Sequence, residues 1–105
     1  MAKALDPNDA KLMAAASTGD HVSLRMCAEI GGQVNAKDPT DSDRTSVHKA
    51  TLGGHEMCLR WLMGLQADFG VQDSDGLTPV HLAARMGHED CLRYMLDELA
   101  AGASS

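Results

Sequence analysis

The sequence is poor in aromatic side chains: its 105 residues include one Trp, one Tyr and one Phe, although 44% are hydrophobic. The core must therefore be built from Ala, Leu, Met and Val. Strands favour aromatic and β-branched residues, so this composition favours closely packed helices over a β-sandwich. A chain of this length buries roughly 65% of the surface that its unfolded form exposes, which allows one modest core.

Several other features are missing, and each absence excludes a class of protein. No run of 18 apolar residues occurs, so no membrane-spanning helix is expected. The opening segment MAKALDPNDAKLM lacks the apolar stretch of a secretory signal. Lys and Arg are scattered singly in a chain of net charge −6, so the basic patch of a nucleic-acid-binding protein is not seen.

Cysteine is also scarce, with three residues, an odd number that leaves one thiol unpaired in any disulfide scheme. A reducing, intracellular setting, cytoplasmic or nuclear, fits this count best. Two His-x-x-Cys pairs, His55–Cys58 and His88–Cys91, have spacings that zinc ligands use. Both pairs fall at the same place in a repeated segment, where Cys behaves as a small buried hydrophobe, so no zinc site is expected.

Calcium is not expected either. The segments DPTDSD and DSDG are similar to calcium loops. In an EF-hand frame with Gly76 at the sixth position, however, the first and last ligands would be Val71 and Leu82, neither of which can ligate. The sequence therefore predicts no metal and no cofactor.

One strong internal pattern is present. The segment DGLTPVHLAARMGHEDCLRYML at 75–96 has a weaker copy, DRTSVHKATLGGHEMCLRWLM, at 43–63. His81 follows His48 by 33 residues, and the shared Cys, Leu and Arg positions repeat at the same distance. Self-similarity at this period indicates stacked structural units, none of which can bury its apolar face alone.

Each unit is predicted to hold two short helices. In the last unit, Thr78 is a suitable N-cap, Pro79 suits the first helical position, and Gly87 can end the helix in the left-handed conformation. The middle unit repeats this order, with Thr45 before its first helix. The expected helices cover residues 8–17, 21–30, 46–52, 55–65, 80–86 and 89–100.

The third unit carries TPVHLAA at 78–84, and Gly-His pairs lie at 54–55 and 87–88. These segments resemble ankyrin repeats, whose signature is T-P-L-H-x-A within a unit of 33 residues. The resemblance implies an all-α ankyrin repeat solenoid of stacked helix-turn-helix units with projecting loop fingers. It divides a single domain, 1–105, into a capping repeat at 6–37, a middle repeat with a two-residue longer finger at 38–72, and a C-terminal repeat and cap at 73–105.

The resemblance also implies structural roles for the shared residues. In the family, the His of the T-P-L-H element bridges backbone groups of adjoining loops. We therefore expect His48 and His81 to join buried hydrogen bonds rather than to act in acid–base chemistry. A structural role is likewise assigned to Thr45, Gly54, Thr78, Pro79 and Gly87.

Partner binding is expected where the repeats differ. In the third unit, Leu82, Arg85 and Met86 are spaced to share one helix face. By resemblance, that face lines the concave groove in which ankyrin proteins commonly bind. The packing stripe of the same helix is expected at Val80, Ala83, Ala84 and Gly87. The expected partner-binding residues are Asp41, Ser42, Arg44, Lys49, Leu52, Ser74, Asp75, Leu77, Leu82, Arg85 and Met86.

Charge and aromatic residues suggest two further features. Four of the six net negative charges lie in the predicted fingers, at 38–44 and 73–75. They suit a partner with a basic or polar rim, or they serve solubility. Trp61 and Tyr94, which are 33 residues apart, are expected to pack along the outer helices, with a partner patch on this convex side as the alternative.

Two functions remain open at this point. The first is a non-enzymatic module, monomeric by itself, that binds another protein through the groove and fingers. The second is a structural or regulatory ankyrin segment permanently docked within a larger protein or complex. An enzyme is not expected, because the sequence shows no paired carboxylates, nucleophile dyad or phosphate loop. Fold alone does not choose between the first two.

Overall fold

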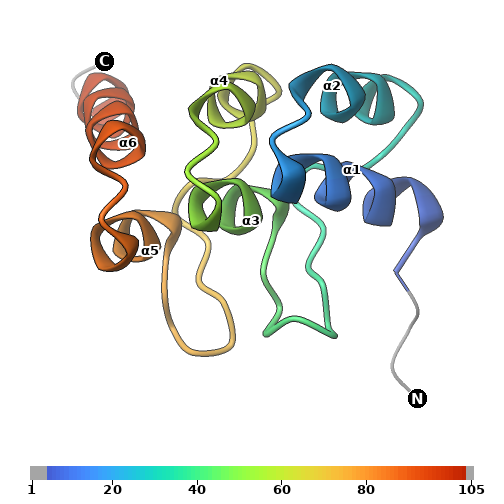
Figure 1. Ribbon diagram of the computed structural model, residues 1–105, viewed down its shortest axis with the longest axis horizontal. Helices are drawn as coiled ribbons and strands as arrows, with labels where there is room; N and C mark the ends of the chain where they lie inside the picture. The colour runs from blue at the N-terminus through green and yellow to red at the C-terminus, as the bar shows by residue number, and fades with distance from the viewer. Residues whose placement is uncertain (1–4, 104–105) are drawn as a thin grey trace.

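The computed structural model describes residues 5–103, with side chains described as far as Ala100. This part of the chain forms paired helices, which confirms the all-α prediction (Figure 1). The helices are α1 (Pro7–Thr18), α2 (His21–Glu29), α3 (Ser46–Leu52), α4 (Glu56–Gly64), α5 (Pro79–Met86) and α6 (Glu89–Ala103).

The helices stack in two rows. The inner row runs α1, α3, α5, and the outer row runs α2, α4, α6, with neighbours in each row in contact (Figure 1). The loops before α3 and α5 project away from the inner row as finger 1 (residues 37–44) and finger 2 (residues 72–77). Each helix pair therefore buries its apolar side against the next pair, as expected for a repeat protein.

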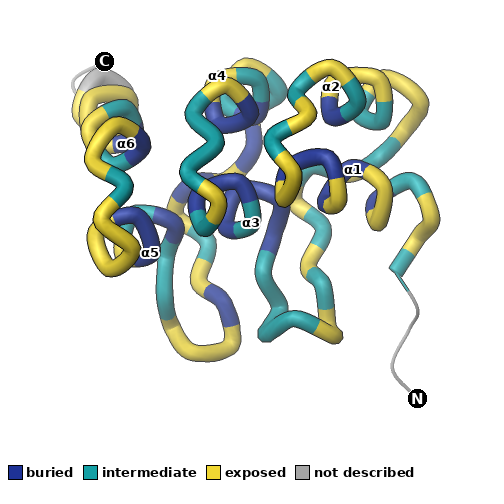
Figure 2. Tube along the Cα trace, in the orientation of Figure 1, coloured by how far each residue is buried: buried dark blue, intermediate teal, exposed yellow. Residues whose placement is uncertain are grey.

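The core is aliphatic, as the composition predicts. Its largest fully buried side chains include Leu12, Leu24, Leu59, Leu62 and Met95. Figure 2 shows that buried segments follow the sides of the helices that face neighbouring pairs, while the outward sides of the outer helices and the loop tips are exposed or half-buried. Burying such a side chain contributes about 1.5–3 kcal/mol to folding, so each contact between neighbouring helix pairs adds to the stability of the stack.

The ends of the inner helices follow the predicted capping residues. The Thr78 Oγ1 accepts the His81 N–H at 3.3 Å, and the His81 Nδ1 accepts the Thr78 N–H at 3.3 Å. Pro79 occupies the first turn, and Gly87 ends the helix with φ of +75°. His81 is exposed, however, so the expectation that it joins buried hydrogen bonds is wrong. Its ring stands at the last helix pair, where no described segment covers it.

The predicted packing stripe of α5 is also wrong in part. Ala84 and Gly87 are exposed, whereas Leu82 retains 2% of its exposure. The reason is that α5 packs on both α3 and α6, so more than one side of the helix is covered. A second difference is that α6 runs to Ala103, beyond the predicted residue 100. The predicted C-terminal cap falls partly on residues 104–105, which lie outside the described residues.

Candidate functional site

Each finger is a closed, hydrogen-bonded loop. In finger 1 the Asp38 N–H donates to the Arg44 carbonyl at 3.0 Å, within an isolated antiparallel bridge. In finger 2 the Asp73 N–H donates to the Leu77 carbonyl at 2.9 Å. The fingers therefore have defined shapes, although neither contains a regular strand or helix.

A buried carboxylate organises finger 2. The Asp73 Oδ1 accepts the N–H of Asp75 at 2.9 Å and that of Leu77 at 3.0 Å. Its other oxygen lies 3.3 Å from the Arg44 Nε of finger 1, and the Asp73 side chain has no exposed surface. Burial acts to raise the pKa of Asp73, but the hydrogen bonds from Leu77, Asp75 and Arg44 outweigh it and lower the pKa below its ordinary value.

Finger 1 is held to α3 by ion pairs. The Lys49 Nζ lies 3.1 Å from Asp38 Oδ2 and 2.8 Å from Asp41 Oδ2. Burial acts to lower the pKa of Lys49, and the two carboxylates outweigh it, so this pKa is raised. The hydrogen bond from Thr40 is the main cause that lowers the pKa of Asp38. Lys49 was predicted to bind a partner, but its ammonium is already paired within the chain.

The two fingers are also joined to each other. The Ser74 N–H donates to the Ser42 carbonyl at 2.8 Å, and Arg44 bridges Asp41 and Asp73. Ser42 and Asp43 take φ of +53° and +55°, a left-handed conformation that costs most residues about 1 kcal/mol or more. The joined fingers retain this conformation and present one continuous edge.

The negative charge of this edge is therefore smaller than the sequence suggests. Within the described residues, Asp38, Asp41 and Asp73 are paired with Lys49 or Arg44. The finger carboxylates without an ion pair there are Asp43 and Asp75. Asp75 is exposed and Asp43 is half-buried. These two carboxylates are the ones best placed to meet a cation on a partner.

A family model described as ankyrin repeats, in three copies, matches residues 12–104. The chain belongs to the ankyrin repeat family. Ankyrin repeats are generally protein–protein interaction modules, a family usually without catalysis. Among the helices that the structure describes, none is both long and apolar enough to cross a membrane.

The groove side of this ankyrin array contains only some of the predicted side chains. Arg85 is exposed at the end of α5, and Met86 retains 51% of its exposure. Leu52 and Leu77 are half-buried. Leu82, placed on the groove by its spacing from Arg85, is buried, and that placement is wrong. The polar predicted residues gather at the joined fingers, and no described hydrogen bond or ion pair connects Arg85 to them.

Sequence reasoning did not assign Asp38 and Asp73, the two residues that organise the fingers. Each accepts the N–H two residues further along, from Thr40 and Asp75 at 2.9 Å, which makes an Asx turn. The signal was present, because D-x-T and D-x-D occur 35 residues apart, one repeat period plus the longer finger. The ion pairs to Lys49 had no comparable local signal.

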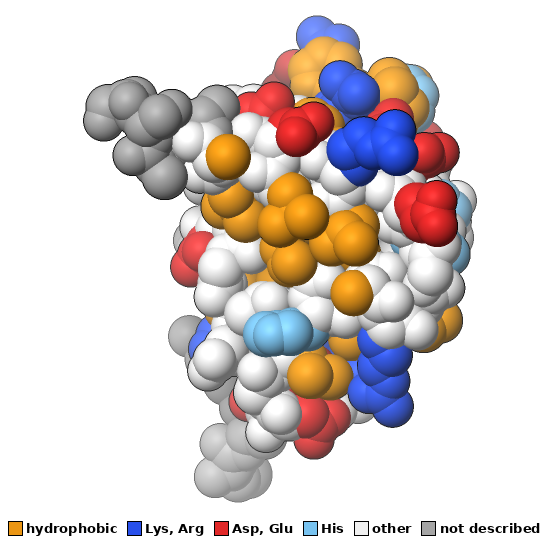
Figure 3. Space-filling model, turned by 90° about the vertical axis from the view of Figure 1, so that its left-hand side faces the viewer, with side chains coloured by type: hydrophobic (Ala, Val, Ile, Leu, Met, Phe, Trp, Pro, Cys, Tyr) orange, Lys and Arg blue, Asp and Glu red, His pale blue; other side chains and the backbone are white. Residues whose placement is uncertain are grey.

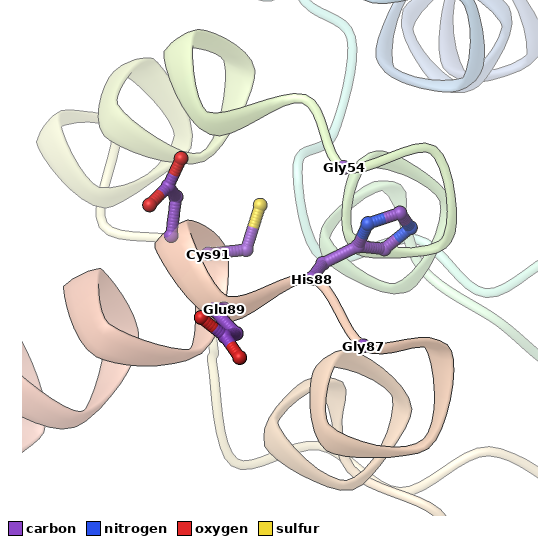
Figure 4. Close-up of a pocket in the computed structure, with 6 residues that line it drawn as sticks. Gly54, Gly87, His88, Glu89 and Cys91 are labelled. Atoms are coloured by element: carbon purple, nitrogen blue, oxygen red, sulfur yellow. The ribbon is translucent and has the colours of Figure 1, made fainter.

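The two His-x-x-Cys pairs take part in contacts between neighbouring helix pairs. His88 Nε2 lies 3.0 Å from the Leu52 carbonyl, and Figure 4 shows its ring directed at the end of α3 near Gly54, with Glu89 pointing away. Cys91 is buried, and burial raises the pKa of its thiol. No group of three or more potential metal ligands is found among the described residues. The hollow of about 320 Å³ beside His88 therefore lacks a ligand set.

Proposed function

We propose that this ankyrin array is a non-enzymatic module that binds another protein through its joined fingers and the neighbouring groove. The observation that supports this best is the link between the fingers: Ser42 bonds to Ser74, and Arg44 pairs with Asp73. A partner then meets an edge that is ordered before binding. Pre-organisation lowers the entropy cost of association, which supports a binding role.

The free groups on this edge suggest the chemistry of the partner. Asp43 and Asp75 offer carboxylates without ion pairs among the described residues. Ser74 is exposed beside them, and Met86 adds an adaptable apolar contact at the groove. We infer a partner with a basic or polar rim around a small apolar contact. Binding of this kind weakens with added salt, because exposed charges are screened.

An intracellular setting and a monomeric free state belong to the same proposal. Cys27, Cys58 and Cys91 are all free thiols, and the last two are buried. A reducing compartment maintains this state. Light scattering on the purified chain under reducing conditions gives the mass in solution, and a dimeric mass would contradict the monomeric state.

The binding proposal is tested by quantitative capture of proteins from a cell extract. The wild-type chain is compared with the double variant Asp43→Lys/Asp75→Lys and with a matched control, Asp90→Lys/Glu98→Lys on α6. Circular dichroism establishes that all three are folded. We expect the wild type and the control to capture the same partner. The finger variant should capture at least tenfold less of it. Equal capture by all three chains would contradict binding through the fingers.

The captured partner also distinguishes the module from the permanently docked segment. A free module exchanges its partner, so excess untagged chain displaces the tagged chain within minutes to hours. A permanently docked segment does not exchange on that time scale. The exchange rate therefore decides between the two functions.

A further inference from the structure

The two junctions between helix pairs use the same backward hydrogen bond. His55 Nε2 lies 3.0 Å from the Ser17 carbonyl, and His88 Nε2 lies 3.0 Å from the Leu52 carbonyl. Ser17 and Leu52 each stand two residues before a glycine with positive φ. Arg85 occupies the same place before Gly87. Its carbonyl is the next acceptor in this series, and no described His reaches it.

The space above the glycines repeats the same pattern. A Cβ on Gly19 would lie 2.6 Å from the His55 ring, and a Cβ on Gly54 would lie 2.9 Å from the His88 ring. A Cβ on Gly87 would have nothing within 4 Å. The site that a His ring covers at both internal junctions is therefore open at the last helix pair.

An arginine on each of the outer helices α2 and α4 stacks on an aromatic ring of the following pair. The Arg25 guanidinium lies 4.9 Å from the centre of the Trp61 ring, and that of Arg60 lies 4.7 Å from the Tyr94 ring. These distances are typical of cation–π contacts. Arg93 is next in the series. It is exposed, and within the described residues it has neither a ring nor an ion pair.

His48 on the inner row donates a hydrogen bond to the next finger, and its counterpart His81 has no such acceptor within the described residues. His48 has no exposed surface, and its Nε2 lies 2.9 Å from the Leu77 carbonyl of the next finger. His81 makes the corresponding Nδ1 contacts with Thr78. Its Nε2 has no hydrogen-bond partner in the described part of the chain. Because Nδ1 accepts the Thr78 N–H, this nitrogen is a donor, and its counterpart in His48 is the one that meets the next finger.

Apolar side chains surround these unused groups. Val47 and Leu59 are fully buried, whereas their counterparts one period later, Val80 and Leu92, are only half-buried. Leu96 retains 49% of its exposure. Figure 3 views this end of the array and shows hydrophobic side chains gathered at its centre, with charges toward the rim. A terminal repeat that meets only water has a polar outer face, and this one does not.

We call this surface the end face, and it consists of Val80, His81, Leu92, Arg93, Leu96 and Leu99. A hollow of about 500 Å³ lies along α6 within it, between Glu89 and Asp97. We propose that the end face docks the leading edge of an ankyrin-type repeat on another protein. That edge supplies a ring over Arg93, a His over Gly87 and a backbone carbonyl for His81. Its apolar helices cover Leu92 and Leu96, as the second and third repeats cover their predecessors.

The described chain does not supply this unit itself. After α4 the chain turns at Gln66, with φ of +65°, and leads toward finger 2. The residue one period later is Leu99, which lies inside α6, because that helix continues to Ala103. Within the described residues the chain therefore runs on along the outer row, and no described finger follows beside α5.

A second copy of the chain also lacks the matching groups. Its leading edge carries Met26 at the place of Trp61 and Tyr94, and Asp20 at the place of His55 and His88. It offers neither a ring to Arg93 nor an imidazole to the open carbonyl. This argument concerns the end of the stack, so it does not depend on binding through the fingers.

The test uses a full-length probe with a matched leading edge. The probe carries Asp20→His and Met26→Tyr, and its own end face is blocked by Arg93→Glu and Leu96→Glu. The control probe carries only the two blocking changes. Isothermal titration measures the binding of each probe to the wild-type chain after circular dichroism shows that both are folded. If Asp20→His unfolds the probe, Met26→Tyr alone replaces it, because Met26 is exposed.

We expect the matched probe to bind one-to-one and at least fivefold tighter than the control probe. Arg93→Ala in the wild-type partner abolishes that difference, whereas Asp75→Asn in finger 2 does not. Equal binding of both probes would show that a second copy is the occupant, and would overturn the choice of partner. No binding of either probe at millimolar concentration would overturn the docking surface.

Discussion

His48 Nε2 lies 2.9 Å from the carbonyl oxygen of Leu77, so the inner helix of the second repeat is bonded to the finger of the third. A carbonyl only accepts, so Nε2 carries the proton. Nδ1 is then free to accept the Thr45 N–H at 3.2 Å. One neutral imidazole thus connects two loops through buried hydrogen bonds, and this tautomer makes its charge state matter for stability.

We expect His48→Ala to lower the free energy of unfolding by about 1–3 kcal/mol, because it leaves buried backbone groups unsatisfied. His81→Ala is the matched control. His81 makes the same local contacts with Thr78 but is exposed, so its loss should cost less than about 1 kcal/mol. Urea unfolding followed by circular dichroism measures both. Equal shifts in midpoint would show that the bond to Leu77 contributes nothing.

His48 should also make stability depend on pH. Burial lowers its pKa below the usual 6.5, with a smaller contribution from the positive charges of Arg44 and Lys37. The hydrogen bond to Leu77 and the charge of Asp73 act against this. The unfolded state therefore takes up the proton at higher pH than the folded state. The resulting stability is fully present above pH 6.5 and is lost as pH falls toward the lowered pKa of the folded state.

We thus expect the wild type to have a lower melting temperature at pH 5 than at pH 7. His48→Gln should remove most of this difference, whereas His81→Gln should retain it. A second loss is expected at lower pH, because Asp38 and Asp73 have pKa values lowered from 3.8. Their contribution is present above that value and is lost as pH falls through the lowered values. An undiminished change between pH 7 and 5 in His48→Gln would contradict the assignment.

The two aspartates of finger 2 should differ strongly in their effect on stability. Asp73→Ala removes a buried acceptor of two backbone N–H groups and of Arg44, so we expect a loss of about 2–3 kcal/mol. Asp75→Ala changes an exposed side chain and should stay within about 0.5 kcal/mol. Thermal unfolding of the two variants provides the measurement. A similar loss of stability in both variants would mean that the hydrogen bonds to the Asp73 carboxylate do not stabilise finger 2.

The local features of the fold were predictable because they depend on neighbours in sequence. Thr45 and the glycine pair after Leu52 fixed α3 at the predicted residues 46–52. The capping residues Thr78 and Pro79 similarly placed α5 to within one residue. In such cases a side chain acts on backbone groups three or four positions away, so the spacing alone carries the information.

The features that sequence reasoning missed depend on contacts across the stack. Leu82 is buried because α5 is covered by both α3 and α6, which its own periodicity does not reveal. The sequence showed no ion-pair partner for Lys49, but Lys49 pairs with Asp38 once finger 1 folds back on α3. His81 and His48 occupy the same position in the repeat. The repeat pattern does not show that His48 lies inside the stack and His81 at its end.

Two glycines offer a test of how closely the repeats pack. Gly54 and Gly87 have similar φ, +71° and +75°, so replacing either by Ala incurs a similar backbone cost of about 1 kcal/mol. Gly54→Ala additionally forces its Cβ to within 2.9 Å of the His88 ring, whereas Gly87→Ala meets open space. We expect the first to lower the melting temperature clearly more than the second. Gly54→Ala introduced into a His88→Ala background should lower the melting temperature by less than it does in the wild type, because the contact with the ring is absent.

Leu82 and Met86 lie four residues apart on α5, and substituting each of them tests packing and binding separately. Leu82→Ala removes a buried side chain and should cost about 2–5 kcal/mol of stability, as other buried leucines do. Met86 retains 51% of its exposure, so Met86→Ala should change stability by less than about 0.5 kcal/mol. Urea unfolding of both variants measures this difference.

The same pair can then be tested against the captured partner. If the groove takes part in binding, Met86→Ala lowers the affinity by about 1 kcal/mol or more while its melting temperature is unchanged. Leu82→Ala should weaken binding only where the protein begins to unfold, so its affinity recovers at low temperature. Full affinity of Met86→Ala, measured on the folded variant, would restrict the binding surface to the joined fingers around Asp43 and Asp75.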